Sequence, residues 1–191
     1  PLLSVLDRKG FKRTPSQNGR FRMTLFPGSR KQEMKLYLAA MCRTAALLNE
    51  AYDDIDFTMS LSTESFREDI TTAISKAGLK NVTISTKSQR ELFSQTDFLL
   101  CASGTATLEA VLFRIPMVML AALPPVTYFL AKHVVRIKLD YVTLPNIVSG
   151  RETIPEFVQS RIIPEHVAQK VMFFREKHNL DGLLSRYDEV E

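Results

Sequence analysis

Short apolar runs alternate with longer stretches of helical periodicity along most of this 191-residue chain. An apolar run of about four to eight residues between turn formers is typical of a buried strand, and apolar residues at i, i+3 and i+4 are typical of a helix. Strands joined by helices pair in parallel, because each crossover returns the chain to the same end of the sheet. The pattern therefore predicts an α/β fold, a Rossmann-like three-layer domain with a parallel sheet.

The pattern also predicts where the elements lie. We expect strands at residues 21–26, 55–60, 82–84, 97–101 and 116–120, and a further strand within 141–147 that leads into a turn at Pro145 and Asn146. We expect helices at residues 31–49, 64–77, 88–95, 103–113, 125–138, 151–160 and 164–178. The core face of the first helix is expected to consist of Met34, Leu38, Met41, Cys42, Ala45 and Leu48.

The length and composition indicate one globular domain. The chain is 45% hydrophobic and 24% charged, and its length suits one sizeable core but not two. We assign residues 21–180 to the domain, residues 1–20 to a linker or remnant and residues 181–191 to a tail. Because the chain begins at Pro1 without a Met, we expect it to be a piece of a longer protein.

The two cysteines indicate a reducing compartment, and we recognise no sorting signal in the sequence. We see no signal peptide at the start and no apolar run near the length of a membrane span. The two cysteines, Cys42 and Cys101, lie among apolar residues and are expected to be buried thiols in a reducing compartment. A disulfide between them is the alternative.

Positive charge is concentrated at the amino end. Residues 1–35 contain nine Lys and Arg against two acidic residues, whereas the remainder is slightly acidic. Nucleic acid is one interpretation of such a cluster. We prefer a solvated linker next to a site for a small anion, because no recognition helix or interleaved aromatic residues accompany the charge. Salt-sensitive binding to duplex DNA would identify the alternative.

The turn after the strand at 97–101 is the first candidate site. Ser103, Gly104 and Thr105 join that strand to a helix, where unpaired backbone N–H groups and the helix dipole suit a phosphate. Glu109, one turn further on, could accept hydrogen bonds from a ribose. The alternative is that Ser103 is an ordinary helix cap and Gly104 merely permits the turn.

A second turn of the same kind follows the first strand. Gly28 lets a ligand approach the backbone, Ser29 supports the turn, and Arg30 could bind a phosphate through two hydrogen bonds. Both turns follow strands, and ligands of parallel sheets bind at the carboxyl ends of strands. The turn at residues 27–30 is not a P-loop, because the spacing to a Lys-Ser/Thr pair is absent. The chain also has no G-x-G-x-x-G, so a nicotinamide or flavin enzyme is disfavoured.

Acid–base and metal chemistry have weaker support. Asn146 could hydrogen-bond a ligand through its amide, although a turn Asn more often bonds its own backbone. Glu33, Asp97, Glu109 and Glu156 are candidate bases by position alone. We find no Cys/His spacing typical of zinc, so no metal is expected.

Four blocks in series resemble lipid-A-disaccharide synthase, a glycosyltransferase of the GT-B type. The blocks are LFPGSR (25–30), ASGTATLE (102–109), DYVTLPNIVSGRE (140–152) and PEFVQ (155–159). The resemblance runs from about residue 21 to about residue 175. It implies that this chain is the carboxyl-terminal, donor-binding domain, which is one half of a GT-B fold.

The resemblance also implies a reaction in lipid A biosynthesis. The full-length enzyme would transfer 2,3-diacylglucosamine from its UDP donor to 2,3-diacylglucosamine 1-phosphate with inversion, without a metal or other cofactor. It would work at the cytoplasmic face of the inner membrane of a Gram-negative cell, on an acceptor glycolipid at the membrane surface. The amino-terminal domain would supply the acceptor site and the catalytic base, so this chain alone should be inactive. A homo-oligomer is also compatible with the sequence.

Site roles carry over residue by residue. Arg30 would face the donor phosphates, with Gly28 and Ser29 supporting that turn. The diphosphate would lie against Ser103, Gly104 and Thr105, the ribose against Glu109, and the cleft beside Asn146.

The chain departs from the family pattern after the strand at 116–120. The family usually has a Tyr followed by a basic residue there, whereas this chain has Ala121 and Ala122. The departure could mean an altered donor preference or a weakened site. Two alternatives to the family function stay open. One is another UDP-sugar enzyme of the same architecture, such as a relative of UDP-N-acetylglucosamine 2-epimerase, and the other is a non-catalytic interaction module in which the missing pair marks a decayed site.

Overall fold

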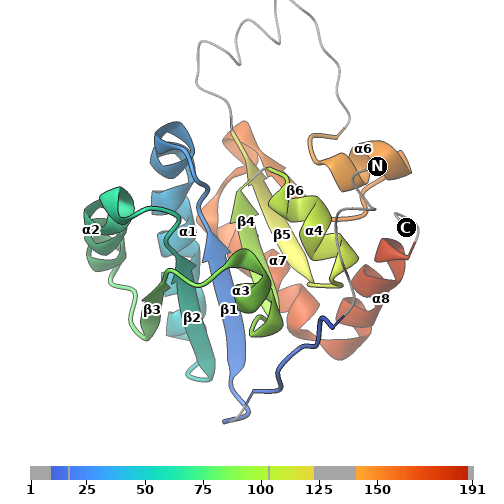
Figure 1. Cartoon of the computed structure of the whole chain (residues 1–191), viewed down its shortest axis with the longest axis horizontal. Coiled ribbons are helices and arrows are strands. Elements are labelled where there is room, and N and C mark those ends of the chain that lie inside the picture. The colour runs from blue at the N-terminus through green and yellow to red at the C-terminus, as the bar shows by residue number, and fades with distance from the viewer. Residues whose placement is uncertain (1–9, 17, 103, 123–140, 189–191) are drawn as a thin grey trace, which may run out of the picture.

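The computed structural model describes residues 10–16, 18–102, 104–122 and 141–188, and within them six strands form one parallel sheet (Figure 1). The strands are β1 (Phe21–Phe26), β2 (Ile55–Ser60), β3 (Val82–Ser85), β4 (Phe98–Ala102), β5 (Met117–Ala121) and β6 (Glu156–Val158). The helices are α1 (Lys31–Ala51), α2 (Arg67–Ala77), α3 (Gln89–Ser94), α4 (Ala106–Leu112), α6 (Leu144–Ser149), α7 (Pro164–Arg175) and α8 (Lys177–Tyr187). Two 3-10 turns are η1 (Glu64–Phe66) and η2 (Gln159–Arg161).

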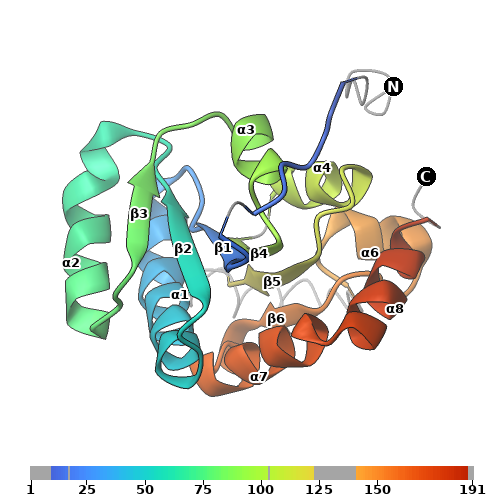
Figure 2. The ribbon, with the colours of Figure 1, turned by 90° about the horizontal axis from the view of Figure 1, so that it is seen from below.

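The strand order is β3-β2-β1-β4-β5-β6. The chain therefore builds the sheet outward from β1 in one direction and then outward from β4 in the other. Helices α1 and α7 lie on one face of the sheet, α3 and α4 lie on the other, and α2 packs beside α1 (Figure 2). This arrangement confirms the predicted Rossmann-like three-layer fold, and it places a change of winding direction between β1 and β4.

The burial of the central strands explains why their sequences are apolar throughout. Every residue of β4 and β5 is buried, because helices cover both faces of the sheet at this point. The predicted core face of α1 is confirmed, since all six of its residues are at most 6% exposed. Burying each large apolar side chain stabilises the fold by about 1.5–3 kcal/mol. Cys42 and Cys101 are free and buried, and burial raises the pKa of the Cys42 thiol to about 12.

An ionic cluster fixes the amino ends of β1 and β4. Asp97 accepts hydrogen bonds from the backbone and the guanidinium of Arg22 at 2.8–3.0 Å, and from Arg13 at 3.2 Å. Burial alone would raise the pKa of Asp97, but the bonds and charges of Arg22 and Arg13 lower the pKa overall. The cluster lies at the end of the sheet opposite to the two predicted ligand turns.

Two expectations in the last third of the chain are wrong. Residues 144–149 form α6 where we predicted a strand and turn, because Thr143 caps the helix and Pro145 occupies its first turn. Residues 151–160 were predicted to be helical, yet they contain β6, which pairs with β5, and η2. The helix expected at 125–138 lies outside the described residues.

The structured part extends beyond the predicted domain limits at both ends. Residues 181–187 belong to α8, and the buried hydroxyl of Tyr187 donates to the carbonyl of Ile115 at 3.2 Å, so a tail beginning at 181 is wrong. Near the start, Phe11 stacks on Phe113 with ring centroids 4.3 Å apart. Arg13 donates to the carbonyl of Thr96 at 2.7 Å. Part of the expected linker therefore packs on the domain.

Candidate functional site

A pocket of about 390 Å³ lies at the carboxyl ends of β1, β2 and β4, where the winding direction changes. Its volume falls in the range of small-molecule sites, roughly 300–1,000 Å³. The lining residues come from four separate connections and include Gly28, Ser29, Arg30, Ser62, Lys87, Gln89, Gly104 and Thr105. The two turns singled out in the sequence thus line the same pocket.

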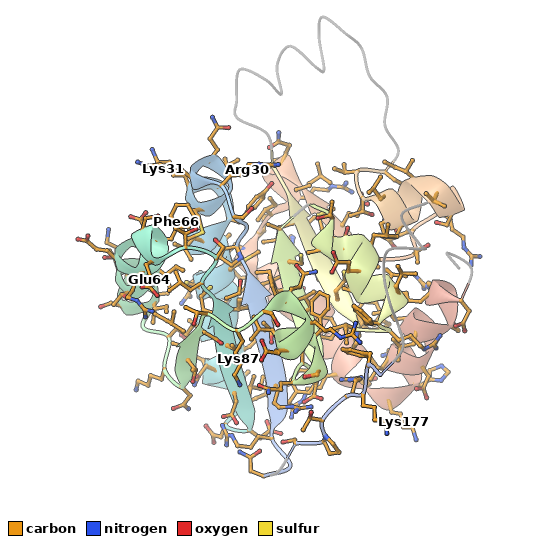
Figure 3. All side chains as sticks on the ribbon, viewed as in Figure 1. Arg30, Lys31, Glu64, Phe66, Lys87 and Lys177 are labelled. Atoms are coloured by element: carbon orange, nitrogen blue, oxygen red, sulfur yellow. The ribbon has the colours of Figure 1, made fainter. Side chains whose placement is uncertain are left out.

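The β1–α1 turn places a cation at the pocket. Gly28 has a φ of 105°, a left-handed conformation that other residues rarely adopt. This turn leads directly into α1, whose first N–H groups lack partners within the helix. Arg30 lies at that junction and lines the pocket (Figure 3). A guanidinium beside a helix amino terminus favours an anionic ligand over a neutral one.

The β4–α4 turn forms the adjacent wall. Gly104 and Thr105 line the pocket, while Ser103 lies outside the described residues. A Cβ built on Gly104 would meet no atom within 4 Å, and the φ of Gly104 is not left-handed. The fold itself therefore does not require glycine at this position. Helix α4 begins at Ala106, three residues later than expected, and Thr105 precedes it without a side-chain cap.

Glu109 is held by a residue that the sequence did not indicate. The amide Nε2 of Gln89 donates to Oε2 of Glu109 at 2.6 Å. Burial raises the pKa of Glu109, and the bond from Gln89 opposes that rise. Glu109 is not among the lining residues itself, but Gln89 is, so the pair connects the carboxylate to the pocket wall.

Three lining residues, Ser62, Lys87 and Gln89, were missed in the sequence. They follow β2 and β3, and only the sheet order shows that these strands end near the two predicted turns. The Oγ of Ser62 lies 3.5 Å from the carbonyl oxygen of Gly28, and Nζ of Lys87 donates to Oε1 of Gln95 at 2.9 Å. Lys87 is labelled in Figure 3. Lys87 adds a second cation to the pocket lining.

Asn146 has a structural role that differs from the expected ligand contact. It is fully buried, and it does not line the pocket. Its amide nitrogen donates to the carbonyl of Ile154 and to Glu156, while its amide oxygen accepts from the backbone of Thr153 and Ile154. These bonds use both ends of the amide, so we assign Asn146 a structural role in place of the expected ligand contact.

The four carboxylates considered as candidate bases lie in different places. Asp97 is bound to arginines at the far end of the sheet, and Glu156 accepts bonds from Thr143, Val142 and Asn146. These contacts give both carboxylates structural roles. Glu109 is the carboxylate that is linked to the pocket wall, and the side chain of Glu33 is not described. Among the described residues, no group of three or more His, Cys, Asp or Glu could hold a metal.

A tyrosine lies beside the departure from the family pattern. The hydroxyl of Tyr37, on α1, donates to the carbonyl of Ala122 at 2.9 Å and accepts from its N–H at 2.8 Å. The backbone that follows β5 is thus fixed by a phenol from another element.

Among the described helices, none is long and apolar enough to cross a membrane.

Comparison with known proteins identifies a family. The lipid-A-disaccharide synthetase family model matches residues 8–181. The lipid-A-disaccharide synthase of Haemophilus influenzae strain Rd is 34% identical over 153 residues, which cover 80% of this chain and 39% of that protein. The enzyme of Erwinia tasmaniensis is 35% identical over 172 residues, covering 88% of this chain and 44% of that protein. The chain thus spans about two fifths of the length of these relatives.

Solved structures support the fold. The C-terminal domain of a group 1 glycosyl transferase from Francisella tularensis has a TM-score of 0.56 at 14% identity, covering 94% of this chain and 93% of that chain. UDP-GlcNAc 2-epimerase from Neisseria meningitidis, bound to UDP-GlcNAc, has a TM-score of 0.59 at 13% identity, covering 92% of this chain and 40% of that chain. The architecture expected for one half of a GT-B fold is confirmed.

Proposed function

Because the chain belongs to the lipid-A-disaccharide synthetase family, we propose that its pocket is the UDP-sugar site of a lipid A glycosyltransferase. The observation that carries the proposal is the convergence of the β1–α1 and β4–α4 turns on one pocket lined by Arg30. A diphosphate needs backbone N–H groups and cations together, and this pocket offers both.

The residues in and beside the pocket take distinct roles in this proposal. Arg30 binds the donor phosphates, and the turn of Ser103, Gly104 and Thr105 lies against the diphosphate. Glu109 accepts hydrogen bonds from the ribose, and an ionised carboxylate makes such bonds stronger than a neutral acceptor would. The open space beside Gly104 lets the diphosphate approach the backbone closely.

The reaction proposed for the full-length protein is an inverting sugar transfer. A hydroxyl of 2,3-diacylglucosamine 1-phosphate attacks the anomeric carbon of UDP-2,3-diacylglucosamine, the bond to UDP breaks, and the acceptor proton passes to a base. Arg30 stabilises the negative charge that develops on the departing UDP, so the residues proposed here act by electrostatics. We place the base and the acceptor site in a second domain, and we expect the 191-residue chain alone to be inactive.

Calorimetric titration of UDP into the 191-residue chain tests the proposal. We expect UDP to bind saturably. Arg30→Ala should weaken that affinity about 10- to 100-fold, the loss that usually follows the removal of a charge-assisted hydrogen bond. Arg161→Ala, which removes an exposed arginine from η2, is the matched control and should leave the dissociation constant unchanged. Equal affinity of the Arg30 variant and the parent chain would refute a phosphate role for Arg30.

A further inference from the structure

A second cavity lies outside the sheet, between α1 and α2. It has a volume of about 570 Å³, larger than the pocket described above. From α1 it is lined at steps of four residues by Lys31, Lys35, Ala39 and Arg43, which places these side chains on one helix face. We call this cavity, together with its lining residues on α1 and α2, the α1–α2 groove.

Helix α2 supplies the opposite wall of the groove. Asp69, Thr72, Ala73, Lys76 and Ala77 line it, again at the spacing of a single helix face. The side chains of Met34 and Leu38 are buried beneath it and form an apolar floor. The groove is therefore apolar at its base and mainly cationic at its rim.

The charge of the groove is largely uncompensated. Four basic side chains face one carboxylate, Asp69. Within the described ranges, none of the ion pairs involves Lys31, Lys35 or Lys76, while Arg43 pairs with Glu50 at 3.5 Å on the exposed surface. Like charges four residues apart on a helix repel each other, so Lys31 and Lys35 destabilise the isolated chain slightly. An external anion would relieve that repulsion.

The groove adjoins the first pocket. Lys31, on its rim, follows Arg30 directly in the chain, and Figure 3 shows both residues at the same end of α1. A surface that binds the groove therefore lies beside the opening of the proposed UDP-sugar site.

We propose that the α1–α2 groove docks the chain onto a bilayer surface rich in anionic headgroups. The proposal rests on the proposed function in one respect, namely that a diacylated donor and acceptor reside in a membrane. Lysines seat their apolar stems against the groove walls and place their ammonium groups among the phosphates. Docking at this face holds the sugar site next to the lipid that it uses.

Vesicle co-sedimentation of the 191-residue chain tests the groove. The vesicles contain phosphatidylcholine alone or phosphatidylcholine mixed with phosphatidylglycerol. We expect binding to the mixed vesicles only, lost at high salt. Lys35→Gln with Lys76→Gln should lower the partition coefficient about 25-fold, from roughly five-fold for each lysine near an anionic surface. Lys31 is left in place because it adjoins Arg30.

The matched control removes two exposed cations of α8, Lys177→Gln with Arg186→Gln, because α8 and α2 lie at opposite ends of the molecule (Figure 2). This double variant should keep partitioning within about two-fold of the parent chain, since charges beyond a Debye length from the groove are screened. Equal losses in the two double variants would overturn the proposal. So would a parent chain that does not bind the mixed vesicles, because a groove that takes only an acidic peptide is not a membrane-docking site. A UDP titration of the same variants should show unchanged affinity. Vesicle binding without any UDP binding would refute the proposed function and leave the groove assignment standing.

Discussion

Gln89 and Glu109 are joined by a hydrogen bond of 2.6 Å across the connection between α3 and α4. The two residues belong to helices that follow different strands, and Gln89 lines the pocket. A half-buried carboxylate would be unfavourable without a partner. The amide therefore holds Glu109 in place before any ligand arrives, and it sets how readily that carboxylate loses its proton.

Replacing Gln89 with Leu should make UDP binding more sensitive to acid. The bond from Gln89 lowers the pKa of Glu109 against burial, which raises it, so losing the bond raises the pKa further. As the pH falls, the carboxylate is then protonated sooner, and affinity for UDP should decline from a higher pH than in the parent chain. Calorimetry across a pH series measures the midpoint, with the exposed Gln169→Leu as control. An unchanged midpoint would remove Gln89 from the site.

Replacing Gly104 with Ala should weaken UDP binding without harming the fold. A Cβ at this position meets no atom of the chain within 4 Å, but it occupies the space proposed for the diphosphate. We expect at least a roughly ten-fold loss of affinity, or about 1.4 kcal/mol. Gly182→Ala, within α8, is the control and should stabilise the chain by about 0.5–1 kcal/mol with no effect on UDP. A stable Gly104→Ala chain that binds UDP normally would exclude close approach of the diphosphate.

Replacing Asp97 with Asn should destabilise the chain by about 1–3 kcal/mol at neutral pH, the range for a lost charged hydrogen bond. The folded-state pKa of Asp97 is lowered, so its stabilisation is present above the unfolded value near 3.8 and is lost as the pH falls through the folded value. Urea unfolding at neutral and acidic pH should show the difference shrinking in acid. Asp56→Asn disrupts the more exposed pair with Arg20 and should change stability by less than about 1 kcal/mol. A pH-independent difference would contradict this account.

Replacing Tyr187 with Ala should destabilise the chain by about 3–5 kcal/mol, because a fully buried aromatic ring is lost. Tyr187→Phe removes only the hydroxyl that donates to Ile115 and should cost about 1 kcal/mol. Urea unfolding distinguishes the two variants, and UDP affinity should stay unchanged in both. If Tyr187→Ala were as stable as the parent chain, the last helix would be dispensable, as for a tail.

Local sequence patterns predicted the first two thirds of the fold well. β4 and β5 are apolar runs that are buried on both faces, and α2 ends at Ala77 as predicted, where Gly78 follows with a φ of 65°. These features depend on neighbouring residues, so a local pattern contains the necessary information.

The last third depended on partners distant in sequence. The run from Tyr141 to Leu144 consists of aromatic, β-branched and apolar residues, which favoured a strand. The helix α6 forms there because Thr143 caps it, Pro145 suits its first turn, and Glu156 holds Thr143. β6 has only three residues and is recognised by its pairing with β5. The same dependence on distant partners limited the prediction of the pocket. The two glycine turns could be recognised in the sequence, whereas the sheet order is needed to see that Lys87 and Gln89 lie beside them.

The packing of the last helices has a consequence for biosynthesis. α7 lies against α1 and β5, and α8 supplies the ring of Tyr187 that contacts Ile115 just before β5. The apolar faces of α1 and β5, which are synthesised early, are therefore covered only after α7 and α8 have been synthesised. During translation, the pocket-bearing segment from residue 26 to residue 106 leaves the ribosome with α1 still uncovered by α7. A nascent chain stalled before residue 164 would therefore expose that face and become a target for chaperones.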